Sequence, residues 1–175
     1  AREVEVKGEA FFDVVEDPET PFIVNTKKMT LEVLGTSFNV NTYDSSRFVT
    51  TLVDGKLAVK PVGSNMDKHI LSPDEQAVFE PEKNQLKIRK VNAHKYTAWR
   101  EGSIYFHDES LENIMTRISR WYSAEIVYLD SSVKDLRFGG NINKHGEIRQ
   151  ILDIIESVDK VEIEVNNDTI YFSKK

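Results

Sequence analysis

The sequence contains no cysteine, no long apolar run and no excess of basic residues. The absence of cysteine excludes a disulfide scaffold, a cysteine nucleophile and cysteine-rich zinc sites, although it assigns no compartment, because periplasmic proteins can also lack cysteine. No apolar stretch approaches the roughly 20 residues that span a bilayer, and no signal peptide is recognisable. Lysine and arginine number 23 against 29 aspartates and glutamates, a net charge of −6. We therefore expect no nucleic-acid partner.

Residue types found in catalytic sites are present, but not in the spacing that such sites need. Gly35–Ser37 resembles the start of a nucleophile elbow, yet that motif needs a glycine where the sequence has Asn39, and a helix where a strand-like stretch follows. No two histidines have the helical spacing of zinc ligands, and there is no P-loop or dinucleotide fingerprint. We predict no enzymatic activity, no cofactor and no metal site. We interpret Gly35–Ser37 as a bend whose hydroxyls bond nearby backbone groups.

Up to about residue 92 the sequence alternates between strand-like stretches and turn residues. From Val4 to Val14 every second residue is apolar or glycine, which is the period of a half-buried strand. Because this pattern begins almost at the first residue, we expect the chain to be part of a longer protein. Asp54-Gly55 lies between two such stretches and predicts a hairpin, and Ser72–Glu75 predicts another turn. These signals predict an all-β domain over residues 1–95, an antiparallel sandwich or roll.

After about residue 96 the period changes to that of amphipathic helices, with strands between them. Apolar residues at i, i+3, i+4, i+7 and i+11 predict a helix from Leu111 to Tyr122, with Ser110 as its N-cap. A second helical pattern runs over residues 148–158. His145 and Glu147 lie just before it and suit capping or surface roles, since an acidic side chain complements the helix dipole at this end. These patterns predict an α+β domain over residues 96–175.

The two helical patterns are the same pattern written twice. Adding 37 to each of seven apolar positions in the first copy gives an apolar position in the second. The pairs are Leu111 and Ile148, Ile114 and Ile151, Met115 and Leu152, Ile118 and Ile155, Ala124 and Val161, Ile126 and Ile163, and Tyr128 and Val165. This predicts a duplicated strand–helix–strand (βαβ) unit, in which each helix packs its apolar face on a sheet built from its own flanking strands.

Ordered blocks of sequence point to a known family. In the first half they are GEAFFDV, PFIVNT, VLGTSFNV, TLVDGKLAV and LSPDEQAVF, and in the second half AWREGSIYFHDESL and RWYSAEIVYLD. Together they resemble the FecR family, the inner-membrane anti-sigma-factor regulators of cell-surface signalling. The residues in these blocks are most similar to those of members from Bacteroidetes. One departure is Asp74, where the family often has glycine.

The resemblance implies a full-length protein with a short cytoplasmic segment that holds a sigma factor, one upstream span of the inner membrane, and this soluble periplasmic portion. The periplasmic portion would receive a signal from the N-terminal signalling domain of a TonB-dependent outer-membrane transporter. The sigma factor would then be released, often through proteolysis of the regulator. In Bacteroidetes such systems commonly control glycan uptake. The duplicated unit resembles the secretin-and-TonB short N-terminal domain.

We expect the partner to contact the C-terminal domain. The predicted hairpin gives the final strand, Thr169 to Phe172, only one neighbouring strand. Its other edge is therefore expected to accept a partner strand. Ile170 and Phe172 would then face the core and Tyr171 the partner. The alternative is that a neighbouring strand already pairs with this edge. Trp121, one step off its helix face, either packs inside the protein or contacts the partner.

Two alternatives remain at this stage. If the final strand is not the interface, the next place to look is LRFGGNI, Leu136–Ile142, whose paired glycines suggest a bulge or a close approach. The alternative function is a β-rich carbohydrate-binding module. Its signature would be exposed coplanar aromatic rings and a calcium site, but the sequence has no calcium-loop pattern.

Overall fold

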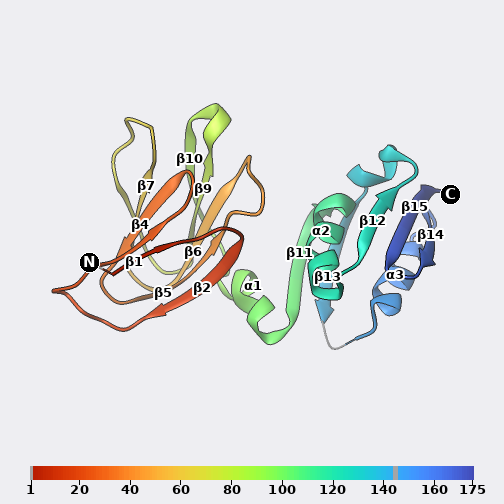
Figure 1. Cartoon of the computed structure of the whole chain (residues 1–175), viewed down its shortest axis with the longest axis horizontal. Helices are drawn as coiled ribbons and strands as arrows, with labels where there is room; N and C mark the ends of the chain where they lie inside the picture. Colours follow the sequence, from red (N-terminus) through yellow and green to blue (C-terminus); the bar gives the residue numbers. More distant parts are fainter. Residues whose placement is uncertain (1, 144–145) are drawn as a thin grey trace. The chain divides into compact units, whose positions relative to one another are not determined.

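The structure is a computed structural model of the 175-residue chain, and it describes residues 2–143 and 146–175. The chain divides into two compact units, Ala1–Thr97 and Ala98–Lys175 (Figure 1), and each has a hydrophobic core of its own. Both units are rich in β-structure. The capping role suggested for His145 lies outside the described residues. No helix in the described ranges is both long and apolar enough to cross a membrane.

The first unit contains two five-stranded sheets. One sheet consists, in spatial order, of β1 (Arg2–Glu5), β3 (Phe22–Asn25), β4 (Met29–Val33), β7 (Leu57–Pro61) and β8 (His69–Leu71). The other consists of β10 (Gln85–Lys90), β9 (Glu75–Glu80), β6 (Phe48–Gly55), β5 (Thr36–Asn41) and β2 (Glu9–Val14). A 3-10 turn, η1 (Pro81–Lys83), joins β9 to β10.

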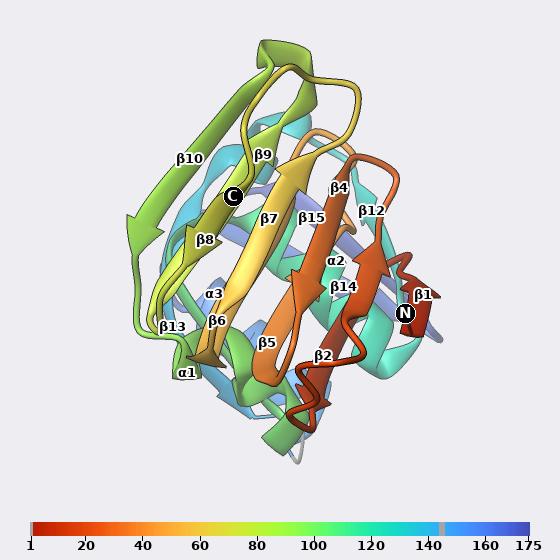
Figure 2. The same cartoon turned by 90° about the vertical axis from the view of Figure 1, so that its left-hand side faces the viewer.

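The inner faces of these two sheets share one core, as expected of a β-sandwich. Figure 2 shows β4 and β7 in front of β5 and β6. Leu31 and Val59 from the first sheet and Phe38 and Leu52 from the second are all fully buried in the same cluster. The predicted antiparallel pairing holds except at one edge, where β1 pairs with β3 in parallel.

The stretch Thr30–Tyr43 crosses from one sheet to the other, because β4 and β5 belong to different sheets. A Cβ on Gly35 would lie 2.5 Å from the Cα of Glu16, so the close approach of these two backbone segments requires glycine. Ser37 lies in β5, and its hydroxyl donates a hydrogen bond of 2.6 Å to Oδ1 of Asp13 across the strand pair. The predicted bend is confirmed, but the partner of Ser37 is a side chain and not nearby backbone.

The predicted hairpin at Asp54-Gly55 is wrong. β6 ends there and pairs with β5 and β9, whereas β7 pairs with β4 and β8 in the other sheet. Gly55 does have a positive φ of 87°, which glycine tolerates best. A Cβ on it would lie 2.5 Å from the carbonyl oxygen of Gly35. The two glycines therefore form one tight crossing of backbone between the sheets.

The predicted turn at Ser72–Glu75 is confirmed. The Glu75 amide donates to the Ser72 carbonyl at 3.0 Å, and Asp74 has a φ of 63°, a left-handed conformation that suits glycine. Asp74 also accepts a hydrogen bond from the Ala93 amide through Oδ1 at 3.0 Å. This bond holds the chain that follows β10 against the turn, just before the short helix α1 (His94–Thr97).

The second unit begins with the 3-10 turn η2 (Ala98–Glu101). Its further elements, in chain order, are β11 (Ser103–Ser110), α2 (Leu111–Tyr122), β12 (Glu125–Tyr128), η3 (Ser131–Asp135), β13 (Arg137–Asn143), α3 (Ile148–Glu156), β14 (Val161–Asn166) and β15 (Thr169–Lys174). Ser110 caps α2 as predicted, since its side chain accepts a hydrogen bond from the Asn113 amide. Glu147 is the N-cap residue of α3 but makes no side-chain cap bond.

The strands of the second unit form two small sheets, β11–β13 and β12–β15–β14. Each helix joins a strand of one sheet to a strand of the other, so the expectation that each helix lies on a sheet of its own flanking strands is wrong. The first strands of the two copies pair with each other, and the second strands flank β15. Figure 1 shows α2 between β11 and β12. The predicted apolar faces of both helices are largely buried in one core, at Leu111, Ile114, Met115, Ile118, Ile151, Leu152 and Ile155, with Tyr122 and Ile148 partly buried against it. The second predicted pattern is wrong at its end, because α3 stops at Glu156 and Val158 is 44% exposed.

Candidate partner-binding surface

The final strand is not an edge strand. β15 is the central strand of its sheet and pairs in parallel with β12 on one side and antiparallel with β14 on the other. Its backbone groups are therefore used on both sides, and the predicted addition of a partner strand to Thr169–Phe172 is wrong. The side-chain directions are as predicted: Ile170 and Phe172 are buried in the core, and Tyr171 is half-buried on the opposite face.

The outer face of the β12–β15–β14 sheet carries different side chains on its β12 side and its β14 side. Strand register places Tyr171 between Val127 on β12 and Glu164 on β14. Leu129, which directly follows β12, leaves 65% of its surface exposed. The β12 side of this face is therefore apolar at Val127 and Leu129, with the exposed carboxylate of Glu125 at the start of the strand. The β14 side is acidic, because Glu162 and Glu164 are both exposed.

Thr169 and Trp121 occupy different places. Thr169 lies on the outer face beside Glu125, and its hydroxyl donates a hydrogen bond of 3.5 Å to a carboxylate oxygen of that residue. Trp121 lies near the end of α2 and is half-buried. The apolar face of α2 packs against the inner side of this sheet. The structure therefore does not bring Trp121 and Tyr171 onto one surface.

A cluster around Tyr128 closes the end of β12. Its ring stacks on Phe172 with centroids 5.5 Å apart, and the ammonium of Lys134 lies 5.0 Å from the ring centroid. Lys134 also forms an ion pair of 2.8 Å with Glu112 at the start of α2. Burial, and to a lesser extent the negative charge of Glu112, raises the pKa of Tyr128 to about 12. Burial also raises the pKa of Tyr122, whose hydroxyl donates to the Gly146 carbonyl at 2.8 Å.

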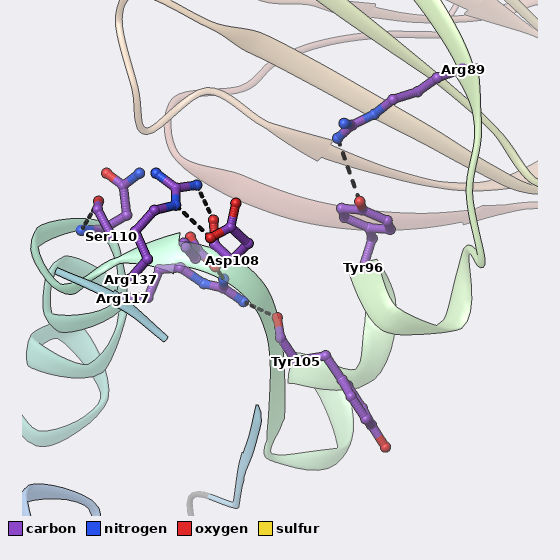
Figure 3. A network of polar contacts seen from close by, with 9 residues as sticks. Arg89, Tyr96, Tyr105, Asp108, Ser110, Arg117 and Arg137 are labelled. Carbon is purple, nitrogen blue, oxygen red and sulfur yellow. Dashed lines mark hydrogen bonds and ion pairs between the residues drawn. The ribbon is translucent and has the colours of Figure 1, made fainter. Parts of the chain in front are cut away.

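Two arginines contact an irregular segment of β11. The register of the β11–β13 pair shifts between Phe106 and Glu109, and Asp108 has a φ of 49°. Figure 3 shows Arg137 bound to Asp108, through the side chain at 2.7 Å and through the backbone carbonyl. Arg117 bonds Glu109 at 2.9 Å. The segment is thus a fixed β-bulge, a device that disrupts regular pairing along a strand.

Arg117 also contacts Tyr105, and Figure 3 shows the ring of Tyr105 pointing away from the arginines. Tyr105 is 41% exposed. The sequence predicts a bulge or a close approach at the paired glycines Gly139 and Gly140 of β13. The register shift is found at this place in the sheet, but the extra residue lies in the facing strand, β11. A side chain at Gly140 would make only ordinary contact with Phe106, at 3.4 Å.

The outer face of the first unit carries a groove of about 400 Å³. It is lined by Thr30, Glu32, Ala58, Lys60, Met66, Asp67 and Lys68, none of them aromatic. The exposed coplanar rings expected of a carbohydrate-binding module are thus not part of this groove. Among residues 2–143 and 146–175, no group of three or more histidine, aspartate or glutamate side chains is arranged to hold a metal ion.

Two family models match the chain: FecR protein over residues 1–58, and FecR, C-terminal, over residues 103–172. Their matches fall one in each compact unit. The chain therefore belongs to the FecR family, a family of regulatory proteins.

Solved structures agree with this assignment. Two crystal structures of a candidate anti-sigma factor from Parabacteroides distasonis ATCC 8503, at 1.65 and 2.50 Å resolution, share the fold with a TM-score of 0.86 each. Their sequence identities to this chain are 29% and 30%, and each match covers 99% of this chain and 80% of the other. No curated protein matches the chain.

Proposed function

We propose that this chain is the periplasmic sensor portion of a membrane-bound anti-sigma factor of the Bacteroidetes type. It receives a signal from the N-terminal signalling domain of a TonB-dependent outer-membrane transporter and controls release of a sigma factor. The sigma factor is held by a cytoplasmic segment beyond this chain, joined to it by an upstream inner-membrane span. The observation that carries the proposal is the similarity over 99% of the chain to an anti-sigma factor candidate.

The two units divide this work. In our proposal, residues 1–95 are the FecR-type β domain and residues 96–175 are the signalling domain. The separate cores and the division at Thr97 support this assignment. The second unit resembles a secretin-and-TonB short N-terminal domain in its duplicated strand–helix–strand order, and such a domain suits recognition of a similar one on the transporter. Trp121 and Tyr171 are proposed partner contacts on this unit.

The test uses the signalling domain of the transporter whose gene adjoins the gene for this chain. Titration of that purified domain into the whole chain, followed by calorimetry, should give saturable binding with one site. A signalling domain from a transporter encoded elsewhere in the same genome serves as the matched control and should bind more weakly. Equal binding of both domains, or of neither, would contradict the proposal.

A further inference from the structure

The duplication creates two equivalent outer edges in the three-stranded sheet, one on β12 and one on β14. Along β12 the amides of Glu125 and Leu129 donate towards β15, to the carbonyl of Asp168 just before that strand at 2.7 Å and to the carbonyl of Phe172 at 2.8 Å. Since successive residues of a strand point their backbone groups to opposite sides, Ile126 directs its amide outward. On β14 the residue 37 positions later, Ile163, does the same.

The outward amides of Ile126 and Ile163 differ in whether a side chain accepts a hydrogen bond from them. On β14, the carboxylate of Glu156 at the end of α3 accepts a hydrogen bond from the Ile163 amide at 3.1 Å. The residue 37 positions before Glu156 is Ser119 on α2, and its hydroxyl bonds instead to the Thr116 carbonyl at 3.0 Å. For the described residues, no side chain accepts from the Ile126 amide. The outward amide at the β14 edge is therefore occupied by a carboxylate, whereas the equivalent amide at the β12 edge is available to a partner.

The side chains beside the open edge suit a partner. On the outer face, Val127 and the 65%-exposed Leu129 offer apolar surface next to the ring of Tyr171. Glu125 leaves an exposed carboxylate at the start of the strand. On the helix side, Thr116, one turn before Ser119 on α2, is also small and polar, whereas Tyr122 on the following turn is large and half-buried. At the position equivalent to Glu156, an extended chain alongside β12 would therefore meet a small hydroxyl and no carboxylate.

We propose that the outer edge of β12 accepts an extended segment of the partner protein as a fourth strand, an inference that rests on the proposed function. The segment carries apolar side chains opposite Val127 and Leu129 and a lysine or arginine opposite Glu125. Such β-augmentation takes its affinity from backbone hydrogen bonds and its specificity from alternate side chains. A second copy of this chain fits less well, because a two-fold pairing centred on Val127 would place each Glu125 against the other copy's Leu129.

The test introduces at the β12 edge the carboxylate that occupies the equivalent amide at the β14 edge. Ser119→Glu places a carboxylate at the position equivalent to Glu156, where it can accept from the Ile126 amide. Binding of the adjoining transporter's signalling domain to the whole chain should weaken at least about tenfold. Ser119→Ala, which adds no acceptor, should bind like wild type. Leu129→Ser should weaken binding by about threefold to tenfold through loss of apolar contact, and circular dichroism checks that each variant is folded.

Hydrogen exchange of the whole chain locates the contact directly. With the signalling domain bound, residues 125–129 should exchange more slowly, and Glu156→Ala should leave affinity unchanged. Wild-type affinity in both Ser119→Glu and Leu129→Ser, or protection confined to β14 or β13, overturns the edge assignment while the proposed function stands. Self-association of the chain that Ser119→Glu abolishes also overturns it, because the occupant is then a second copy. Absence of binding by wild type overturns both proposals.

Discussion

Gly35 is required by space and not by backbone angle. It lies where the chain passes from β4 to β5, and a Cβ there would come within 2.5 Å of the Glu16 Cα. Gly35→Ala should therefore destabilise the first unit by about 1–3 kcal/mol, because two backbone segments must separate. Denaturant unfolding followed by circular dichroism measures this loss. Tryptophan fluorescence, which comes only from Trp99 and Trp121 in the second unit, should show an unchanged transition. Gly140→Ala, with only an ordinary 3.4 Å contact, is the control and should change stability little.

Tyr128 provides a test of the cluster at the end of β12. Its pKa of about 12 lies above the ordinary tyrosine value, so the folded state holds this proton more tightly than the unfolded state. Stability from this group is fully present below about pH 10 and is lost as the pH rises towards 12. At about pH 11 an ordinary tyrosine is about nine-tenths ionised. Wild type and Tyr128→Phe should then show nearly the same phenolate absorbance, provided circular dichroism shows an intact fold.

Glu112→Gln is the matched variant for this titration. Removing the negative charge that contributes to the raised pKa should move ionisation of Tyr128 to lower pH. A full tyrosine equivalent of phenolate lost in Tyr128→Phe at about pH 11 would show that the ring is not shielded as the structure places it.

At the scale of elements, the two helices repeat one packing solution. Ile114 and Ile151 are 2% and 6% exposed and occupy equivalent positions. Ile114→Asp and Ile151→Asp should each destabilise the second unit by about 3–5 kcal/mol, because each buries an unpaired carboxylate. Thermal melting followed by tryptophan fluorescence measures the effect. Ile154→Asp is the control on the same helix as Ile151, since Ile154 is 67% exposed, and it should change stability by less than about 0.5 kcal/mol. If Ile114→Asp or Ile151→Asp melts within about 1 °C of wild type, that helix face is not core.

The helices and the Ser72–Glu75 turn could be predicted from the sequence, but strand partners could not. The apolar period gives both ends of α2 and the start of α3, because a helix is defined by residues close in sequence, but the predicted pattern runs past the end of α3 at Glu156. Strand pairing joins distant residues, so the same alternation is compatible with several neighbours. Gly55 looked like a hairpin turn and proved to be a crossing between sheets. The residues of β15 looked like an edge because the hairpin with β14 was visible in sequence, whereas the pairing with β12, more than 40 residues away, was not.

The candidate surface shows the same limit. Tyr171 and the core-facing residues on either side of it could be predicted from alternation alone. The hydrogen bond from the Ile163 amide to Glu156 could not be predicted, because Glu156 is an ordinary polar residue at the end of a helix until the strand beside it is known. The duplication is the one sequence signal that could have revealed the difference between the edges, since it aligns Glu156 with Ser119.

At the scale of the whole molecule, two separate cores suggest two folding units. The buried clusters share no residue, and the boundary lies between Thr97 and Ala98. Each helix and each sheet of the second unit is completed within that unit. A domain that buries its own core can fold alone if it is large enough, and domains of this size commonly do.

We therefore predict that residues 96–175, expressed alone, fold cooperatively. Both tryptophans lie in this fragment and are half-buried in the whole chain, so its emission should remain blue-shifted and should move to the red in one transition on addition of denaturant. Residues 1–95 should show the circular dichroism of β-structure and no tryptophan signal. A fully red-shifted spectrum from residues 96–175 without denaturant would mean that the two units form one cooperative structure. Mixing the two fragments tests whether the units cooperate. If they do, residues 96–175 should recover blue-shifted emission only when residues 1–95 are added.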